Sequence, residues 1–399
     1  MVLACVCCAG FSRQGPAVAT LTIFVEPMTA EFGWSRTALS GAVSLGGVLA
    51  AVASPFIGPY LDARGAKAVL MLAILVTGVA CMALSLTPSL VVFYLLFCLA
   101  RMNFAGPYDL GIYGAVTNWF VRRRARANSL ASLAQMLGLV LMPLVAHFAI
   151  LGSGWRGGWV AVGLTVLIVG FVPVWLFMAR RPEDLGLRPD GRPAPGATGR
   201  ETPVEEPAFT RAQALATPAF WLLAGFTALV FPVQAGISLH QAPHLIERGL
   251  DATVAAMTVS TFSAVSALTS FALGFWPARL PLRLALALTG GFLGASAWVM
   301  LGIDSAAEGY ISAALFGLGI GGILTMLPLA WANYFGRASF GAIRGVALSV
   351  QVLAQASGPL LSGVLRDLTG DYALSLKSFA ALSFAGVLVA LFAKPPPRP

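Results

Sequence analysis

Long apolar stretches recur along this chain, and they restrict its fold more than any other feature of the sequence. A stretch of about 20 apolar residues is long enough to cross the roughly 30 Å hydrocarbon core of a bilayer as a helix. Only 10% of the residues are charged and 58% are hydrophobic, whereas a soluble domain carries roughly 25% charged residues. Such a chain has too little polar surface to face water on all sides. The sequence therefore predicts an all-α membrane protein.

Twelve spans can be drawn, and they fall into two groups of six. Segment 180–216 separates the groups, and its prolines and charged residues predict an extended cytoplasmic linker that buries no core. The predicted domains are an N-terminal six-helix bundle (1–179), the linker (180–216) and a C-terminal six-helix bundle (217–399). The predicted spans are 2–29, 37–60, 68–87, 89–118, 127–151, 157–179, 217–245, 252–277, 284–303, 307–334, 345–365 and 373–393.

The first half of the chain recurs weakly 216 positions later. Chance would give about two glycine and one proline matches at this register, against six and three in the sequence. The charges mostly do not recur, since Arg13 becomes Leu229 and Arg101 becomes Gly317. Two copies of one membrane unit are typical of secondary transporters. The matched pairs are Pro16/Pro232, Pro27/Pro243, Glu31/Glu247, Gly33/Gly249, Gly58/Gly274, Gly78/Gly294, Tyr94/Tyr310, Gly106/Gly322, Pro143/Pro359, Gly154/Gly370 and Gly170/Gly386.

The distribution of Lys and Arg predicts the orientation in the membrane. If both termini are cytoplasmic, the inner segments hold 18 of these cations and the outer segments hold four. Cytoplasmic loops carry such an excess, so the protein is predicted to lie in the cytoplasmic (inner) membrane with both termini in the cytoplasm. The net charge of +9 is explained by these loops, and no nucleic-acid partner is expected.

The turn after the second span reads Gly58-Pro-Tyr-Leu-Asp62-Ala-Arg64-Gly65-Ala-Lys67. It resembles the signature loop of the major facilitator superfamily, which implies that it latches the two halves on the cytoplasmic side. Gly58 is expected to allow close helix approach and Gly65 a tight turn. Asp62 is expected to lie at the N-terminus of a neighbouring helix and to pair with a nearby cation.

Further segments resemble a narrower group, the bacterial monocarboxylate-transporter-like and oxalate–formate-antiporter-like proteins. The resemblance covers nearly the whole chain, and it implies the twelve-helix fold and transport of small organic anions. The segments are EFGWSRTALSGAVS (31–44), NWFVRRRARANSL (118–130), RRPEDLGLRPDG (180–191), TPAFWLLAGF (217–226), YFGRASFGAIRG (334–345) and GPLLSGVLRDLTGDY (358–372).

Arg101 is the strongest candidate for binding a substrate anion. An ionisable group at bilayer depth costs about 2.5–3.5 kcal/mol, so its presence indicates a functional or structural role. A guanidinium can hold a carboxylate with two hydrogen bonds. Two alternatives remain open, a structural pair with Asp109 and a side chain that reaches the outer surface. Asn103 and Tyr108, close by in the sequence, are expected to orient the anion.

Arg13 is the second candidate, a third of the way along the first span. Pro16 loosens the helix there and is expected to free a carbonyl. The resemblance implies that the first helix of each half lines the cavity. The alternative, of about equal weight, is an arginine that reaches the inner membrane surface.

Candidates in the second half are Gln234 and His240, which are expected to orient the anion. A histidine near the cavity titrates near neutral pH, so His240 is a candidate for the coupled proton; a hydrogen-bonded packing role is the alternative. The Gly358-Pro359 pair is expected to permit helix bending. The span 252–277 lacks the charge that the resembled transporters carry there, which disfavours a simple lactate or oxalate substrate and favours a less charged or larger acid.

The sequence predicts a monomeric secondary transporter that moves a small organic anion, coupled to protons, by alternating access. No ATP-binding loop is present, and no cofactor, metal site or enzymatic activity is expected. Its partners are the anion, protons and the lipid bilayer. The alternatives are an exporter of hydrophobic compounds on the same scaffold and, third, a membrane sensor that does not transport.

Overall fold

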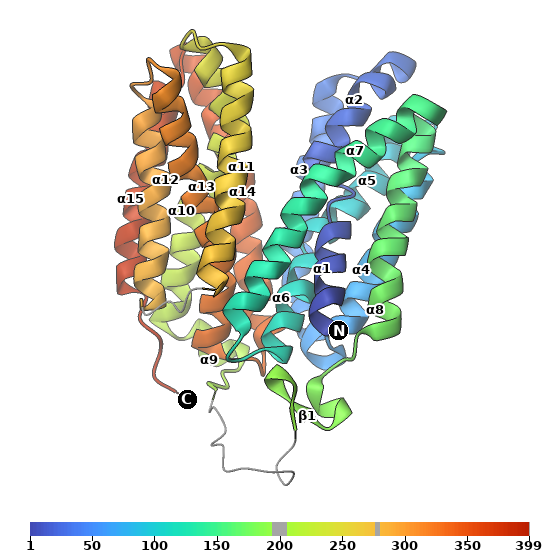
Figure 1. Ribbon diagram of the computed structural model, residues 1–399, viewed down its shortest axis with the longest axis vertical. Coiled ribbons are helices and arrows are strands. Elements are labelled where there is room, and N and C mark those ends of the chain that lie inside the picture. The colour runs from blue at the N-terminus through green and yellow to red at the C-terminus, as the bar shows by residue number, and fades with distance from the viewer. Residues whose placement is uncertain (194–205, 276–279, 399) are drawn as a thin grey trace. The chain divides into compact units, whose positions relative to one another are not determined.

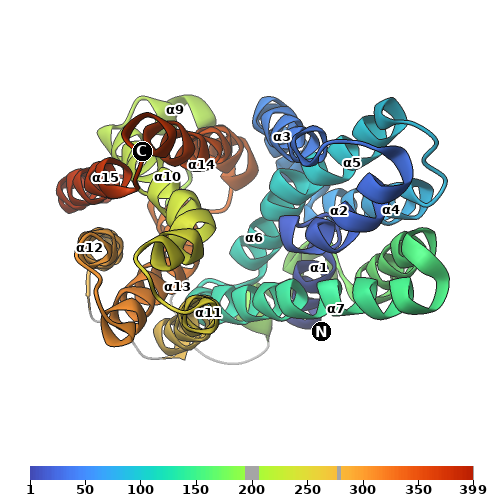
Figure 2. The same cartoon turned by 90° about the horizontal axis from the view of Figure 1, so that it is seen from above.

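The computed structural model describes residues 1–193, 206–275 and 280–398. It divides the chain into two compact units. The first contains Met1–Ala208 and Gly336–Ser349, and the second contains Phe209–Phe335 and Val350–Pro399. Figures 1 and 2 show that each unit is built from helices packed side by side.

The first unit holds the N-terminal helices. It also includes the beginning of α14, because Gly336–Ser349 groups with it. Its helices are α1 (Val2–Ser12), α2 (Val18–Phe32), α3 (Arg36–Arg64), α4 (Ala66–Leu84), α5 (Leu90–Ala105), α6 (Pro107–Trp119), α7 (Arg124–Thr165), the π-helix η1 (Val166–Phe171) and α8 (Val172–Phe177).

The second unit is all-helical in its described part. It begins with a short helix that carries a capping box between Thr210 and Gln213. Its helices are α9 (Arg211–Leu215), α10 (Pro218–Glu247), α11 (Ala252–Phe275), α12 (Leu282–Met300), α13 (Ala306–Phe335), α14 (Phe340–Thr369) and α15 (Ala373–Phe392).

Ten helices of the described chain are long and apolar enough to cross a membrane. The all-α membrane fold is thereby confirmed, but several predicted spans differ from expectation. The first predicted span, 2–29, is interrupted between α1 and α2. The fifth and sixth run on as one element, with non-helical backbone at Ser153 and Gly154 where the turn was expected.

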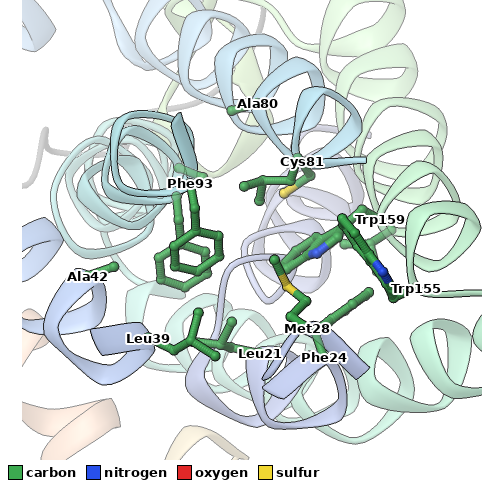
Figure 3. Close-up of a cluster of buried hydrophobic side chains, with 14 of the residues drawn as sticks. Leu21, Phe24, Met28, Leu39, Ala42, Ala80, Cys81, Phe93, Trp155 and Trp159 are labelled. Atoms are coloured by element: carbon green, nitrogen blue, oxygen red, sulfur yellow. The ribbon is translucent and has the colours of Figure 1, made fainter. Parts of the chain in front are cut away.

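An aromatic cluster forms part of the core of the first unit. Figure 3 shows Phe24 of α2 against Trp159 of α7, and their stacked rings lie 3.9 Å apart between centroids. Phe93 and Phe97 of α5 stack at 5.3 Å. All four side chains are fully buried, so the aromatic contacts hold α2, α5 and α7 together.

Large apolar side chains also cover the outside of the helices. Phe56, Leu95 and Phe148 are each about two-thirds exposed or more. Scattered apolar residues are normal on a soluble protein, but a surface this rich in them matches a lipid solvent. The outward-facing side chains thus agree with the apolar composition.

The sequence repeat has a structural counterpart in four glycines that end helices or turn the chain. Gly33 and Gly249 have φ of 68° and 85°, and Gly154 and Gly370 have φ of 68° and 85°. This left-handed region favours glycine because other residues carry a Cβ that crowds the backbone there. The repeat therefore conserves the turns of the two units.

The repeated glutamates also act alike. Glu31 at the end of α2 pairs with Arg156 at 2.6 Å, and Glu247 at the end of α10 pairs with Arg366 at 2.8 Å. Each pair ties the first span of its unit to a later helix of the same unit. Glu31 additionally accepts a hydrogen bond from the indole of Trp155 at 2.6 Å.

The expectation of an extended linker at 180–216 is wrong for the described residues of this segment; residues 194–205 lie outside them. Its elements are the 3-10 helix η2 (Pro182–Leu185), β1 (Leu187–Arg188), η3 (Pro189–Gly191), β2 (Arg192–Pro193) and α9. β1 and β2 pair antiparallel, at the end of the first unit where Figure 1 marks the N-terminus. The Asp190 carboxylate accepts hydrogen bonds from the backbone N–H groups of Arg122 (3.0 Å) and Arg123 (3.2 Å), just before α7.

Replacement of Asp190 by Ala should destabilise the protein by about 1 kcal/mol, because backbone donors at a helix start lose their acceptor. Asp190→Asn should retain most of the stability. Thermal unfolding in detergent, followed by tryptophan fluorescence, measures the effect. Asp184→Ala is the matched control, since Asp184 makes only an exposed 3.8 Å pair with Arg180. Equal shifts in the two Ala variants would contradict the capping role.

Candidate functional site

Two helix breaks meet inside the first unit. The first span is interrupted at Arg13–Ala17, where Pro16 lies. The fourth is interrupted at Gly106, whose φ of −111° and ψ of −85° are not helical, and Pro107 starts α6. Proline has no N–H to donate, and a break leaves carbonyl groups without their helical partners. The breaks thus lie at Pro16 in the first span and at Gly106 and Pro107 in the fourth.

Arg13 fills the gap between the two breaks. Its Nε donates to the carbonyl of Phe104 at 2.8 Å, just before the break at Gly106. Its Nη1 donates to Oε1 of Gln135 on α7 at 2.6 Å. Gly10 leaves room for Gln135, since a Cβ at Gly10 would lie 3.0 Å from Gln135 Cγ. Arg13 is therefore held in the interior of the unit and does not reach for a membrane surface.

Arg101 lies next to Arg13 across one aromatic ring. The guanidinium carbons of Arg101 and Arg13 lie 4.2 Å and 4.5 Å from the centroid of Phe104. The two cations are thus within about 9 Å of each other, because both are in cation–π range of the same ring. Gly46 of α3 gives Arg101 its space, since a Cβ there would lie 2.6 Å from Arg101 Cβ.

Arg101 has cationic donors that nothing in the described part of the chain uses. Its Nε and Nη1 are buried and have no hydrogen-bond partner among these residues. Leaving a buried charged donor without an acceptor costs more than leaving a neutral one. This side chain is the group in the first unit that is best suited to accept an anion.

Asp109 does not pair with Arg101, so the proposed Arg101–Asp109 pair is wrong. The helix break at Gly106 lies between the two residues and changes the faces they present. The carboxylate of Asp109 instead lies 3.1 Å from Arg344 Nη2 and 3.8 Å from Arg13 Nη1. Asp109 and Arg344 are 4% and 1% exposed, which makes this a buried ion pair.

Arg344, Gln135 and Phe104 were not predicted as site residues. Arg344 was counted as a loop cation at the inner end of a span, but α14 begins at Phe340 and places it within the helix. Gln135 carried a usable signal, since it is a buried polar residue in an apolar span. Phe104 carried none, because phenylalanine is ordinary in a membrane helix.

Asn103 bonds within its own helix, whereas the buried hydroxyl of Tyr108 has no hydrogen-bond partner among the described residues. The Nδ2 of Asn103 donates to the carbonyl of Leu99 in its own helix at 3.0 Å. The side chain of Tyr108 is fully buried. Their placement supports packing around the break at Gly106.

The second unit contains the remaining two candidates, both on α10. Gln234 Oε1 accepts from Gln355 Nε2 at 3.1 Å, and its Nε2 lies 3.4 Å from Ser238 Oγ. His240 Nε2 lies 3.4 Å from the carbonyl of Pro359. These contacts join α10 to α14 through polar side chains.

His240 has a second neighbour in Tyr372, at the start of α15. Its Nδ1 lies 3.3 Å from the hydroxyl of Tyr372. Burial raises the pKa of Tyr372 above its ordinary value of 10.0, and Glu247 nearby raises this pKa further. The phenol stays protonated, and the tautomer of His240 decides whether the hydroxyl donates to Nδ1 or accepts from it.

The Gly358-Pro359 pair lets α10 and α14 approach closely. A Cβ at Gly358 would collide with the carbonyl oxygen of Pro232. Pro359 lies inside α14 without ending it. The pair therefore serves close packing in the second unit.

The hydroxyl groups of α11 largely bond to backbone. Ser270 Oγ donates to the carbonyl of Gly321 on α13 at 3.0 Å. Others donate to carbonyls of their own helix, namely Thr258, Thr261, Ser263 and Thr269. These contacts hold the hydroxyls against the backbone of α11 and α13.

The signature loop contacts the start of α14. Asp62 accepts from the N–H groups of Gly341 and Ala342 at 2.7 Å each, in the first turn of α14. A carboxylate at a helix N-terminus is stabilised by the free N–H groups and by the helix dipole. A Cβ at Gly58 would collide with the carbonyl of Gly341, and Gly65 has a φ of 83°.

The two basic residues of this loop differ in their surroundings. Lys67 donates from Nζ to the carbonyl of Trp175 at 2.9 Å, which ties α4 to α8. Arg64 is exposed at the end of α3. The cation next to Asp62 is neither of these, because Arg181 donates to the backbone carbonyl of Asp62 at 2.7 Å.

A second charged cluster, which the sequence did not predict, surrounds Glu206. Its carboxylate lies 2.6 Å from Arg124 and 3.5 Å from Arg337. The side chain of Arg124 is 2% exposed, so Glu206 compensates a buried cation. Arg337 also pairs with Glu183 at 2.7 Å. The end of the linker is thereby fixed to the first unit.

Comparison with known proteins identifies the family of this chain. The Major Facilitator Superfamily profile matches residues 2–359. Human monocarboxylate transporter 11 is 27% identical over 288 residues, covering 69% of this chain and 58% of that protein. The membrane sensor protein UhpC of Salmonella typhimurium is 30% identical over 210 residues, covering 50% of this chain and 47% of that protein. The chain thus spans about half to three-fifths of the length of these relatives.

Solved structures show the same fold. The transporter FucP in the outward conformation aligns over 98% of both chains with a TM-score of 0.74 and 12% identity. The human organic anion transporter MFSD10 aligns over 98% of both chains with a TM-score of 0.70 and 14% identity. The apolar helices, the signature loop at Gly58–Lys67 and the profile match agree, and the chain belongs to the major facilitator superfamily.

Proposed function

We propose that this protein is a secondary active transporter of a small organic anion that carries a carboxylate, driven by a proton gradient. The observation that carries the proposal is Arg101, a cation at membrane depth whose Nε and Nη1 have no partner among the described residues. An ionisable group in a membrane span is costly, so it marks a functional site unless a structural partner satisfies it. A relative named monocarboxylate transporter 11 supports the same class of substrate.

The two arginines take different parts in the proposed site. Arg101 binds the carboxylate directly with its unused donors. Arg13 already donates to Phe104 and Gln135, so it adds positive charge and holds the breaks of α1–α2 and α5–α6 together. Gln234 and His240 are retained as proposed contacts in the second unit. By alternating access, the two bundles would rock about the site and open it to each side in turn.

Export of hydrophobic cations by the same fold is the weaker hypothesis. Such a substrate needs a buried carboxylate that is free to bind it. Asp109 is paired with Arg344, and Glu26 is exposed. The charges described in the first unit favour an anion.

A second candidate function is a membrane sensor that binds an anion without moving it. The similarity to the membrane sensor protein UhpC favours this alternative. Both candidates need the Arg101 site, but only the transporter needs to release its ligand on the other side. Binding and transport therefore have to be measured separately.

Replacement of Arg101 by Ala should weaken carboxylate binding about tenfold to a hundredfold, because a charge-assisted hydrogen bond contributes about 1.5–3 kcal/mol. Thermal-shift measurements on the purified protein with pyruvate, L-lactate, benzoate and succinate at two pH values test this. A ligand at about a hundred times its Kd should stabilise the wild type by about 2.7 kcal/mol. Arg122→Ala, in an exposed loop, is the matched control. Unchanged carboxylate affinity in Arg101→Ala would refute the assignment.

Reconstitution into liposomes should separate transporter from sensor. A transporter should accumulate the radiolabelled carboxylate that binds best, when the lumen is more alkaline than the outside, and a protonophore should abolish the accumulation. Empty liposomes and the Arg101→Ala variant are the controls. Binding in detergent without uptake or exchange in liposomes would favour the sensor.

A further inference from the structure

We propose that Asp109 is the residue that takes up the coupled proton, and that it does so because the transported anion at Arg101 competes with it for the positive charge of Arg13. The inference rests on the proposed anion transport. It replaces His240, which the sequence suggested, as the site of the proton.

The geometry places Asp109 at the centre of the positive charge in the first unit. Its carboxylate lies 3.1 Å from Arg344 and 3.8 Å from Arg13, and the side chain is 5% exposed. The other contacts of Arg13 are to neutral oxygens, those of Phe104 and Gln135. The charge of Arg13 is therefore balanced by Asp109 alone among the described contacts.

An anion at Arg101 changes this balance. The guanidinium groups of Arg101 and Arg13 both lie within cation–π range of the Phe104 ring, so a carboxylate bound at Arg101 adds a second negative charge to the region that holds Asp109 and Arg13. Two carboxylates that share one set of cations in a poorly solvated site repel each other, and one of them then binds a proton more readily. The proton and the anion consequently favour each other's binding, and this coupling is reciprocal.

The other titratable and charged groups around α6 do not substitute for Asp109. Tyr113, one helical turn further along α6, and Arg101 on α5 face the same region. On the neighbouring helices, Asp62 of α3 caps α14 and Lys67 of α4 bonds to Trp175. Arg124 of α7 pairs with Glu206. Asp109 is thus the carboxylate among the described residues that directly contacts Arg13 and Arg344.

The proposed step conserves the proton and the charge. A proton from water on one side binds a carboxylate oxygen of Asp109 when the anion binds at Arg101. Arg13 and Arg344 then face one neutral acid and one anion in place of one carboxylate. When the anion leaves on the other side, Asp109 returns its proton to water there and pairs again with both arginines. One monocarboxylate moves with one proton, without net charge transfer.

Proton uptake during binding tests the proposal directly. The probes are pyruvate, L-lactate, benzoate and succinate, added to the full-length protein in weakly buffered detergent with a pH indicator. In the wild type, uptake of about one proton per anion is expected. The affinity for the anion should fall about tenfold for each unit by which the pH rises, over the pH range where uptake occurs. In Asp109→Asn both effects should disappear, while Asp109→Glu should retain them.

Liposomes provide the second measurement. Asp109→Asn should lose uptake driven by a pH gradient but keep exchange of internal for external anion, because exchange needs no net proton movement. The variant leaves Arg344 without its carboxylate partner and risks misfolding. The double variant Asp109→Asn/Arg344→Gln, which removes both charges, is measured alongside it. Loss of pH dependence with retained exchange in either variant supports the proposal.

Three results overturn the proposal, and a fourth, the absence of any binding, overturns the proposed transport as well. Continued uptake of one proton per anion in Asp109→Asn refutes it. Loss of proton uptake in His240→Gln with retention in Asp109→Asn returns the proton site to His240. If the wild type binds none of the probes, the proposed carboxylate transport itself fails. Binding without proton uptake in the wild type refutes proton coupling alone.

Discussion

The hydrogen bond from Arg13 to the carbonyl of Phe104 is the interaction on which the first unit depends most. Lipid offers no partners to free backbone groups, so a broken helix survives in a membrane only where protein groups satisfy it. The break at Gly106 frees carbonyls, and the break at Arg13–Ala17 places a guanidinium where it meets one of them. The side chain at one break thus supplies the hydrogen-bond donor for a carbonyl at the other. The same side chain brings positive charge next to Arg101 and Asp109. Arg13 therefore both satisfies a free backbone carbonyl and adds positive charge to the anion site.

The two units share their glycine turns and glutamate–arginine pairs but differ in their other charged residues. The repeated glycines at Gly33/Gly249 turn the chain in both, and the repeated glutamates pair with arginines in both. The repeated Pro16/Pro232 pair behaves differently. Pro16 lies in a break, whereas Pro232 lies inside the continuous helix α10. Equal prolines thus have unequal effects, because the neighbouring Gln14-Gly15 and Arg13 favour an open turn only in the first unit.

Much of the candidate site was visible in the sequence, for an energetic reason. A charge within an apolar span is costly, so Arg13, Arg101 and Asp109 stand out without any structure. Their partners did not stand out. Arg344 lies near a span end, where a cation is ordinary, and the helical spacing of Arg101 and Asp109 suggested a pair that the break at Gly106 prevents. Helical periodicity holds only while the helix is continuous, and the sequence did not determine where α5 ends and α6 begins.

By itself, the sequence determined that the chain lies in a lipid bilayer, and it determined the class of fold and the family. Apolar span length, loop charge and turn glycines are local properties. The signature loop was equally readable, since Gly58, Asp62 and Gly65 lie within eight residues. Only the tertiary structure decided which charges meet. Asp109 pairs with Arg344, 235 positions away, and Arg13 with Gln135, 122 positions away. Such pairs depend on the packing of distant helices, and no local pattern encodes the register in which those helices come together.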